Sequence, residues 1–196
     1  MLISGMTNSG KTHYLLDLLE SDYKHKFDYI FIVCPTFHYN KTYDRKFIYN
    51  DQDVIPLIVG NKLNDVLEEL FKRYSLASGK FADEQTLIII DDCANLYDAK
   101  LKATALTKLA FHGRHANISV WILTQKYNAI VKDFRENISV LVLFYDKNKE
   151  SREAAFKEND IGLSSDEKDK IVKELKSRKG AKVVLRLVQP FEFYIL

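Results

Sequence analysis

A glycine-bounded loop near the start of the chain constrains its fold more than any other feature. Residues 5–12 read Gly-Met-Thr-Asn-Ser-Gly-Lys-Thr and complete the pattern G-x-x-x-x-G-K-[ST], directly after the apolar residues 1–3. The two glycines let backbone N–H groups approach a phosphate, because no Cβ obstructs it. The helix expected to begin near Gly10 directs its positive N-terminal end at the same anion. A glycine turn without a ligand is the alternative, but the pattern favours a nucleoside triphosphate site.

The residue types of this loop, called the P-loop below, have distinct expected tasks. Lys11 can reach the β- and γ-phosphates, and the Thr12 hydroxyl can bind Mg²⁺. We therefore expect ATP and Mg²⁺ as cofactors, while the preference for ATP over other triphosphates stays open. The expected nucleotide-contacting residues are Gly5, Thr7, Asn8, Ser9, Gly10, Lys11, Thr12 and His13.

Length and composition predict a single α/β domain over residues 1–196. The net charge of +2 provides no strongly basic tail, so a nucleic-acid partner would have to meet a local basic surface. Cys34 and Cys93 lie in or beside apolar runs without metal-ligand spacing, and we expect buried free thiols. No apolar run is long enough to span a membrane, and no signal peptide precedes the loop, so we expect an intracellular protein.

Continuous apolar runs alternate with helical or charged segments, as in a mainly parallel sheet flanked by helices. Helices are expected over about residues 10–20, 62–76 and 100–111. The core covers residues 1–145, and the charged segment 146–179 is interpreted as a solvated helical face. Strands at 182–188 and 191–196 predict a C-terminal hairpin at a sheet edge. The five core strand candidates are Met1–Ser4, Tyr29–Cys34, Thr86–Ile90, Ser119–Thr124 and Val140–Tyr145.

Two consecutive carboxylates, Asp91 and Asp92, follow the apolar strand 86–90. In P-loop proteins a strand-terminal acid completes the Mg²⁺ shell, and Asp91 has that position. The side chain of Asp92 is expected on the opposite side of the strand, where it could orient and deprotonate an attacking water. A helix N-cap and its neighbour would be the structural alternative.

Two further polar residues flank the next strand. Gln125 follows its carboxyl end, where ligands bind in open α/β sheets, and is expected to sense the γ-phosphate or the attacking water. A solvated strand cap is the alternative for Gln125. Before the strand, Gly113 is expected to end a helix, and Arg114 to project from a short loop. Arg114 is a candidate arginine finger for a neighbouring subunit, or else a structural helix-end residue. His112 and His115 are interpreted as polar loop residues.

These segments together resemble one family. The P-loop, the strand ending in Asp91-Asp92 and the stretch Gly113-Arg114-His115-Ala116-Asn117-Ile118-Ser119-Val120-Trp121-Ile122-Leu123-Thr124-Gln125 are similar to the viral DNA-packaging ATPases of the poxvirus and giant-virus type, within the FtsK/HerA superfamily. The resemblance covers roughly residues 1–145. It implies a P-loop NTPase fold of the additional-strand (RecA/FtsK-like) type, with core strand order 5-1-4-3-2.

The resemblance also implies a function and partners. It indicates a ring-forming motor that pumps double-stranded DNA into a capsid, in the host cytoplasm or a viral factory, with virion association left open. Capsid or portal-type viral proteins are candidate partners. By the same resemblance Lys11 and Thr12 bind triphosphate and Mg²⁺, and Asp91 completes the metal shell. Asp92 becomes the catalytic base, Gln125 the sensor and Arg114 the trans-acting finger.

Two other functions use the same loop. A nucleoside or small-molecule kinase needs an arginine-rich lid, and the charged segment contains only Arg152 and Arg178. A GTP-binding switch needs Asn-Lys-x-Asp after the fourth strand, which the chain lacks. The packaging motor is therefore the favoured prediction. Candidates for sequence-independent phosphate contacts with DNA are Lys100, Lys102, Lys108, Lys126, Lys132 and Arg135. For each of them a solvated surface residue is the alternative.

Overall fold

The computed structural model describes residues 1–50, 53–57, 63–75, 84–93 and 105–196. These residues divide into two compact units along the chain. One unit consists of residues 1–11 and 123–196, and the other consists of residues 12–122. The chain passes from one to the other between Lys11 and Thr12, and again within a strand between Ile122 and Leu123. The expectation that 1–196 act as a single domain stays a prediction.

The unit of residues 12–122 contains a parallel sheet with the strand order β3-β2-β4-β5. The register aligns Tyr29 with Thr86, and Thr86 with Ile118. Every residue of β4 is buried, as expected for an apolar strand covered on both faces. The strands are β2 (Tyr29–Val33), β3 (Val54–Leu57), β4 (Thr86–Ile90) and β5 (Ile118–Thr124), whose last two residues belong to the other unit.

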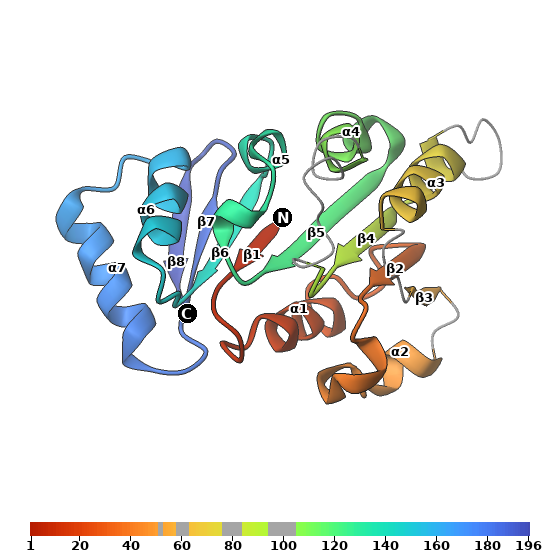
Figure 1. The fold of residues 1–196 in the computed structure, drawn as a ribbon, viewed down its shortest axis with the longest axis horizontal. Helices are drawn as coiled ribbons and strands as arrows, with labels where there is room; N and C mark the ends of the chain where they lie inside the picture. Colours follow the sequence, from red (N-terminus) through yellow and green to blue (C-terminus); the bar gives the residue numbers. More distant parts are fainter. Residues whose placement is uncertain (51–52, 58–62, 76–83, 94–104) are drawn as a thin grey trace. The chain divides into compact units, whose positions relative to one another are not determined.

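Helices cover this parallel sheet. In Figure 1, α3 and α4 lie beside each other on one side of the strands, while α1 and α2 lie on the other. Leu67 and Leu70 of α3 and Leu109 of α4 are buried in the core. Short 3₁₀ segments cover Phe37–Tyr39, Lys41–Tyr43 and Gly113–Ala116. The helices are α1 (Lys11–Glu20), α2 (Lys46–Asn50), α3 (Leu63–Ser75) and α4 (Ala105–His112).

The unit of residues 1–11 and 123–196 contains β1 (Leu2–Ser4), which pairs in parallel with β6 (Val140–Phe144). Next to β6, β7 (Lys182–Arg186) and β8 (Glu192–Ile195) follow as antiparallel strands. The predicted C-terminal hairpin at a sheet edge is thereby confirmed. Three helices complete the unit: α5 (Lys132–Glu136), α6 (Lys149–Glu158) and α7 (Ser165–Ser177).

The charged segment forms α6 and α7 and ends in a loop of residues 178–181 before β7. Buried Phe156 and Leu175 anchor the two helices, and their charged side chains lie mostly at the surface. Ser164 begins α7 with a capping box, because its hydroxyl accepts from the Glu167 N–H and the Glu167 carboxylate accepts from the Ser164 N–H. The two helices with mostly exposed charges agree with the interpretation of this segment as a solvated helical face.

The strand order agrees with the predicted order 5-1-4-3-2 within each unit. The second, third and fourth predicted strands are neighbours as β2, β4 and β5, and the first and fifth are neighbours as β1 and β6. Sequence analysis missed β3 because Pro56 interrupts it and proline is excluded from central strands. Among the described residues of its unit β3 pairs only with β2, so it is an edge strand there, where proline is tolerated.

Three smaller expectations concern the two cysteines, membrane-spanning segments and the helix predicted over about residues 100–111. Cys34 and Cys93 are buried free thiols, and burial raises the pKa of Cys34 to about 11. Among the described residues no helix is long and apolar enough to cross a membrane. The start of the helix predicted over about 100–111 lies outside the described residues, and α4 begins at Ala105.

Candidate nucleotide-binding site

The P-loop links β1 to α1 and depends on conformations that few residue types adopt. Asn8 has φ 59° and Gly10 has φ 102°, both in the left-handed region. At Gly5 a Cβ atom would lie 2.5 Å from Phe144 Cβ, so any side chain would displace β6. The Gly5 N–H donates to the Thr124 carbonyl (3.2 Å), and the Met6 N–H donates to the Tyr145 carbonyl (3.1 Å). Backbone hydrogen bonds therefore hold the start of the loop against the carboxyl ends of β5 and β6.

Lys11 places its positive charge against this loop. Its Nζ donates to the Gly5 carbonyl at 2.7 Å and to the Met6 carbonyl at 2.9 Å. The side chain is buried, with 9% of its surface exposed. A buried ammonium held by two backbone carbonyls is well placed to bind an anion, because it is already desolvated and fixed in position.

The two predicted Mg²⁺ ligands, Thr12 and Asp91, lie close together in the unit of residues 12–122. Thr12 Oγ1 donates to Asp91 Oδ2 at 2.9 Å, and Asp91 is buried. Hydroxyl and carboxylate oxygens are hard donors, and Mg²⁺ is commonly held by one or two such groups together with substrate phosphates. The pair therefore fits Mg²⁺. In the ranges that the structure describes, no group of three or more His, Cys, Asp or Glu side chains offers a metal site made by protein alone.

Tyr43 also contacts the Asp91 carboxylate. Its hydroxyl donates to Asp91 Oδ2 at 2.7 Å, from a ring that is completely buried. Burial, together with the adjacent Asp91 charge, raises the pKa of Tyr43 well above its ordinary value. Tyr43 therefore remains protonated and keeps donating, which fixes the Asp91 carboxylate and stabilises its charge.

Asp92 differs from Asp91 in both exposure and backbone. It is exposed, it has φ 55°, and one of its oxygens accepts a hydrogen bond from Thr36 Oγ1 at 3.1 Å. Asp and Asn tolerate the left-handed region better than most residues, which explains how the chain turns directly after β4. An exposed carboxylate next to the buried Asp91 has access to water, as a general base requires.

The segment after β2 supplies contacts that sequence analysis did not identify. Besides Thr36 and Tyr43, it contains Arg45, whose guanidinium contacts α1. Arg45 Nη1 donates to Asp17 Oδ1 at 2.9 Å and to a Glu20 carboxylate oxygen, and Nη2 lies 3.2 Å from His13 Nδ1. His13, predicted to contact nucleotide, is thus bonded to Arg45. No spacing pattern in the sequence marks these residues, since they act through long-range contacts.

Gln125 and Arg114 lie at opposite ends of β5. Gln125 is exposed and follows Thr124, the residue that accepts from the Gly5 N–H, so it lies beside the P-loop. Arg114 lies in the 3₁₀ turn of residues 113–116 before β5, where a loop was predicted. The strands β4 and β5 are parallel. Arg114, just before β5, therefore lies at their amino ends, and Asp91, just after β4, lies at their carboxyl ends. Five residues of β4 at about 3.3 Å each separate the two ends by roughly 16 Å.

The candidate DNA contacts have mixed surroundings. Lys108 pairs with Glu68 (2.8 Å), Lys132 with Glu136 (3.1 Å) and Arg135 with Glu158 (3.2 Å). Lys126 is exposed in the turn after Gln125. Lys100 and Lys102 lie outside the described residues. A role of any of them in DNA binding stays a prediction.

Comparison with known proteins identifies the family to which this site belongs. The sequence profile of the family described as Poxvirus A32 protein matches residues 1–190. The chain belongs to the poxvirus A32 protein family. The predicted resemblance to poxvirus-type packaging ATPases is thereby confirmed. Proteins named DNA packaging protein OPG160, from variola virus and from vaccinia virus strain Western Reserve, are each 29% identical over 146 residues. That alignment covers 71% of this chain and 50% of each relative, so the chain spans about half the length of these relatives.

Solved structures show the same fold. B204, described as the DNA-packaging ATPase from Sulfolobus turreted icosahedral virus, matches with a TM-score of 0.70 at 17% identity, over 99% of this chain and 94% of that chain. The genome-packaging NTPase B204 from the related virus 2, in complex with AMPPCP, matches with a TM-score of 0.67 at 19% identity, over the same shares. The A32-family chain therefore has the fold of P-loop packaging ATPases, as predicted.

Proposed function

We propose that this chain is an ATP-hydrolysing motor that translocates double-stranded DNA and packages a viral genome. The observation that carries the proposal is the hydroxyl–carboxylate pair of Thr12 and Asp91, found in a chain that also has a complete P-loop. Membership of the poxvirus A32 protein family and relatives named DNA packaging proteins support the DNA substrate. The nucleotide-bound B204 structures support ATP as the energy source.

In this proposal each site residue has one task. Lys11 and the P-loop amides bind the β- and γ-phosphates and orient the terminal phosphorus. Thr12 and Asp91 hold Mg²⁺, which when bound neutralises developing phosphate charge. Asp92 accepts a proton from the attacking water, and Gln125 orients that water or the γ-phosphate. Tyr43 keeps Asp91 in place for this chemistry.

Arg114 is proposed to act on a neighbouring copy. Its place before β5, at the opposite end of the strands from Asp91, separates it from the Mg²⁺ pair of its own chain. An arginine finger that acts in trans does not have to lie near the triphosphate site of its own chain. We therefore propose a homo-oligomeric ring, in which capsid or portal-type viral proteins are further partners. The protein would act inside the host cell, in the cytoplasm or a viral factory.

Duplex DNA is expected to raise the rate at which the purified protein hydrolyses ATP. A DNA motor couples ATP hydrolysis to movement along DNA, whereas a kinase transfers the phosphate to a small acceptor molecule. Phosphate release should therefore rise severalfold with added duplex DNA and stay constant with added nucleosides. Faster ATP consumption with a nucleoside and none with DNA would favour the kinase alternative instead.

Mixing two inactive variants tests the finger. An Arg114→Ala subunit should bind ATP normally and hydrolyse poorly, and Lys11→Ala should remove hydrolysis at its own site. In mixed assemblies an intact P-loop meets an intact Arg114, so some activity should return and should increase with protein concentration. Mixtures that remain inactive although subunit exchange is demonstrated would count against a trans finger, and Arg114 would then be a structural residue.

A further inference from the structure

The residues on either side of Gln125 are attached to different parts of the molecule. On the strand side, the Thr124 carbonyl accepts from the Gly5 N–H of the P-loop at 3.2 Å. On the other side, the Tyr127 N–H donates to Ser151 Oγ of α6 at 3.0 Å. All of these residues belong to the same compact unit. Because Gln125 itself is exposed, burial does not hold it, and these two attachments fix the backbone around it.

The Thr124 side chain closes a turn that contains Gln125. Its Oγ1 accepts from the Lys126 N–H at 3.3 Å and donates to the Lys126 carbonyl at 2.9 Å. Hydrogen bonds from a threonine hydroxyl to the backbone two residues later stabilise such turns. Only one residue separates this turn from Tyr127, so a displacement of Tyr127 would be transmitted to the backbone of Gln125.

Tyr127 is held through its hydroxyl as well as through its backbone. The residue is 1% exposed, and its hydroxyl donates to Glu158 Oε2 at 2.9 Å and accepts from Asn159 Nδ2 at 2.8 Å. Burial raises the pKa of Tyr127, so the hydroxyl stays protonated and continues to donate. A buried hydroxyl that has both a donor and an acceptor partner is confined to one position, because moving it would leave polar groups unsatisfied.

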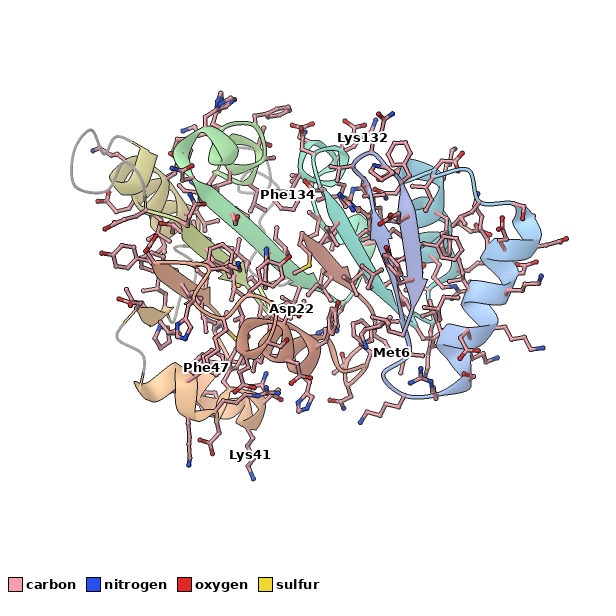
Figure 2. The ribbon with its side chains drawn as sticks, turned by 180° about the vertical axis from the view of Figure 1, so that it is seen from behind. Met6, Asp22, Lys41, Phe47, Lys132 and Phe134 are labelled. Atoms are coloured by element: carbon pink, nitrogen blue, oxygen red, sulfur yellow. The ribbon has the colours of Figure 1, made fainter. Side chains whose placement is uncertain are left out.

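Arg135 covers the ring of Tyr127 from α5. Its Cζ lies 4.9 Å from the ring centroid, and its Nη2 pairs with Glu158 Oε1 at 3.2 Å. The Arg135 side chain is only 10% exposed. Figure 2 labels two neighbours on α5, the exposed Lys132 and the buried Phe134, which anchors this short helix. Arg135 is a candidate DNA contact by sequence, but its burial in this network favours a role in holding Tyr127.

We propose that Tyr127 is a positioning residue for Gln125, held in place by Glu158, Asn159 and Arg135. The inference rests on the proposed function, because it takes Gln125 to orient the attacking water or the γ-phosphate. An orienting side chain must be held to within about 0.5 Å of its productive position, and an exposed residue needs rigid neighbours for that. Tyr127 acts only through the backbone of Gln125. The charged helix α6 thereby supports the catalytic site from behind.

Steady-state kinetics of Tyr127→Phe provide the first test. The substitution keeps the buried ring and removes the hydroxyl that Glu158 and Asn159 hold. We expect kcat to fall roughly tenfold, as a small misplacement of an orienting group implies, while the KM for ATP stays unchanged. Tyr194→Phe is the matched control, because that exposed tyrosine also donates to a glutamate, Glu192, at 2.7 Å. It should change neither constant.

A double-mutant cycle with Gln125→Ala distinguishes positioning from a general loss of packing. If Tyr127 acts through Gln125, adding Tyr127→Phe to Gln125→Ala should lower kcat no further. Glu158→Ala removes the acceptor of the Tyr127 hydroxyl and leaves the ring in place, so it should show the same loss and the same non-additivity. It replaces Tyr127→Phe in the cycle if that variant unfolds. An equal fractional loss of kcat with and without Gln125 would overturn the proposal.

Two controls separate this inference from the proposed function. Full turnover in Gln125→Ala, with Lys11→Ala inactive, would overturn the positioning role and leave the ATPase assignment intact. Full turnover in Lys11→Ala would overturn the P-loop assignment and the positioning role together. An unchanged kcat in both Tyr127→Phe and Glu158→Ala would overturn the positioning role alone.

Discussion

Replacement of Lys11 by Ala is expected to abolish ATP hydrolysis, with a loss of roughly 10²-fold or more, and to weaken nucleotide binding. The phosphates lose their contact with the Lys11 ammonium, the only charged side chain among residues 5–12. The variant also loses the two hydrogen bonds from Nζ to the Gly5 and Met6 carbonyls, so the loop becomes less constrained. Steady-state phosphate release and calorimetric ATP binding measure the two effects.

A second variant separates charge from packing at this position. Lys11→Met retains the buried aliphatic stem and removes only the ammonium, so it should be as inactive as Lys11→Ala but should unfold closer to the unmodified temperature. Lys173→Ala, at an exposed lysine of α7, serves as a control for the loss of a lysine. Turnover near that of the unmodified chain in both Lys11 variants would remove the P-loop assignment.

The two consecutive aspartates are expected to respond differently to the same substitution. Asp92→Asn should keep ATP and Mg²⁺ bound while turnover falls by roughly 10²-fold or more, because the attacking water loses its base. Asn tolerates the left-handed backbone at this position, so the turn after β4 should persist. Asp91→Asn should instead weaken Mg²⁺ binding, because a buried carboxylate held by Thr12 and Tyr43 loses its charge.

Both variants are compared by titrating Mg²⁺ at saturating ATP and by measuring turnover at saturating Mg²⁺. Excess Mg²⁺ should partly restore the Asp91→Asn variant and should not restore Asp92→Asn. If excess Mg²⁺ rescued Asp92→Asn instead, the two roles would have to be exchanged. Equal behaviour of the two variants would contradict the separate roles, Mg²⁺ binding by Asp91 and proton acceptance by Asp92, that their different burial suggests.

The sequence predicted the parts of the fold that depend on local pattern. The long apolar runs that became β4 and β5 are readable because a strand buried on both faces needs nearly every residue to be apolar. The edge strand β3 was not readable, since four residues including Pro56 carry no such signal. The P-loop was readable because its glycines and Lys11 have fixed spacing.

The surroundings of the site were less predictable. Tyr43 reaches Asp91 across 48 positions of sequence, and Gly180 approaches Gly10 across an even longer separation. Contacts of this kind depend on tertiary packing, and a tyrosine or a charged loop has no spacing rule that would reveal them. The roles of Asp92, Gln125 and Arg114 were predicted from their positions and from the resemblance, and they remain predictions until the variants are measured.

The position of Arg114 has a consequence for how copies of the chain could communicate. Arg114 and Asp91 lie at opposite ends of parallel strands, so if Arg114 acts in trans as proposed, the surface that receives it differs from the surface that donates it. Such a heterologous contact repeats head to tail and closes into a ring or extends as a filament, but it cannot be satisfied within a two-fold dimer. Each triphosphate site would then depend on one neighbour and not on the other. In a ring, this dependence would run in one rotational sense, because every copy would donate Arg114 in the same direction.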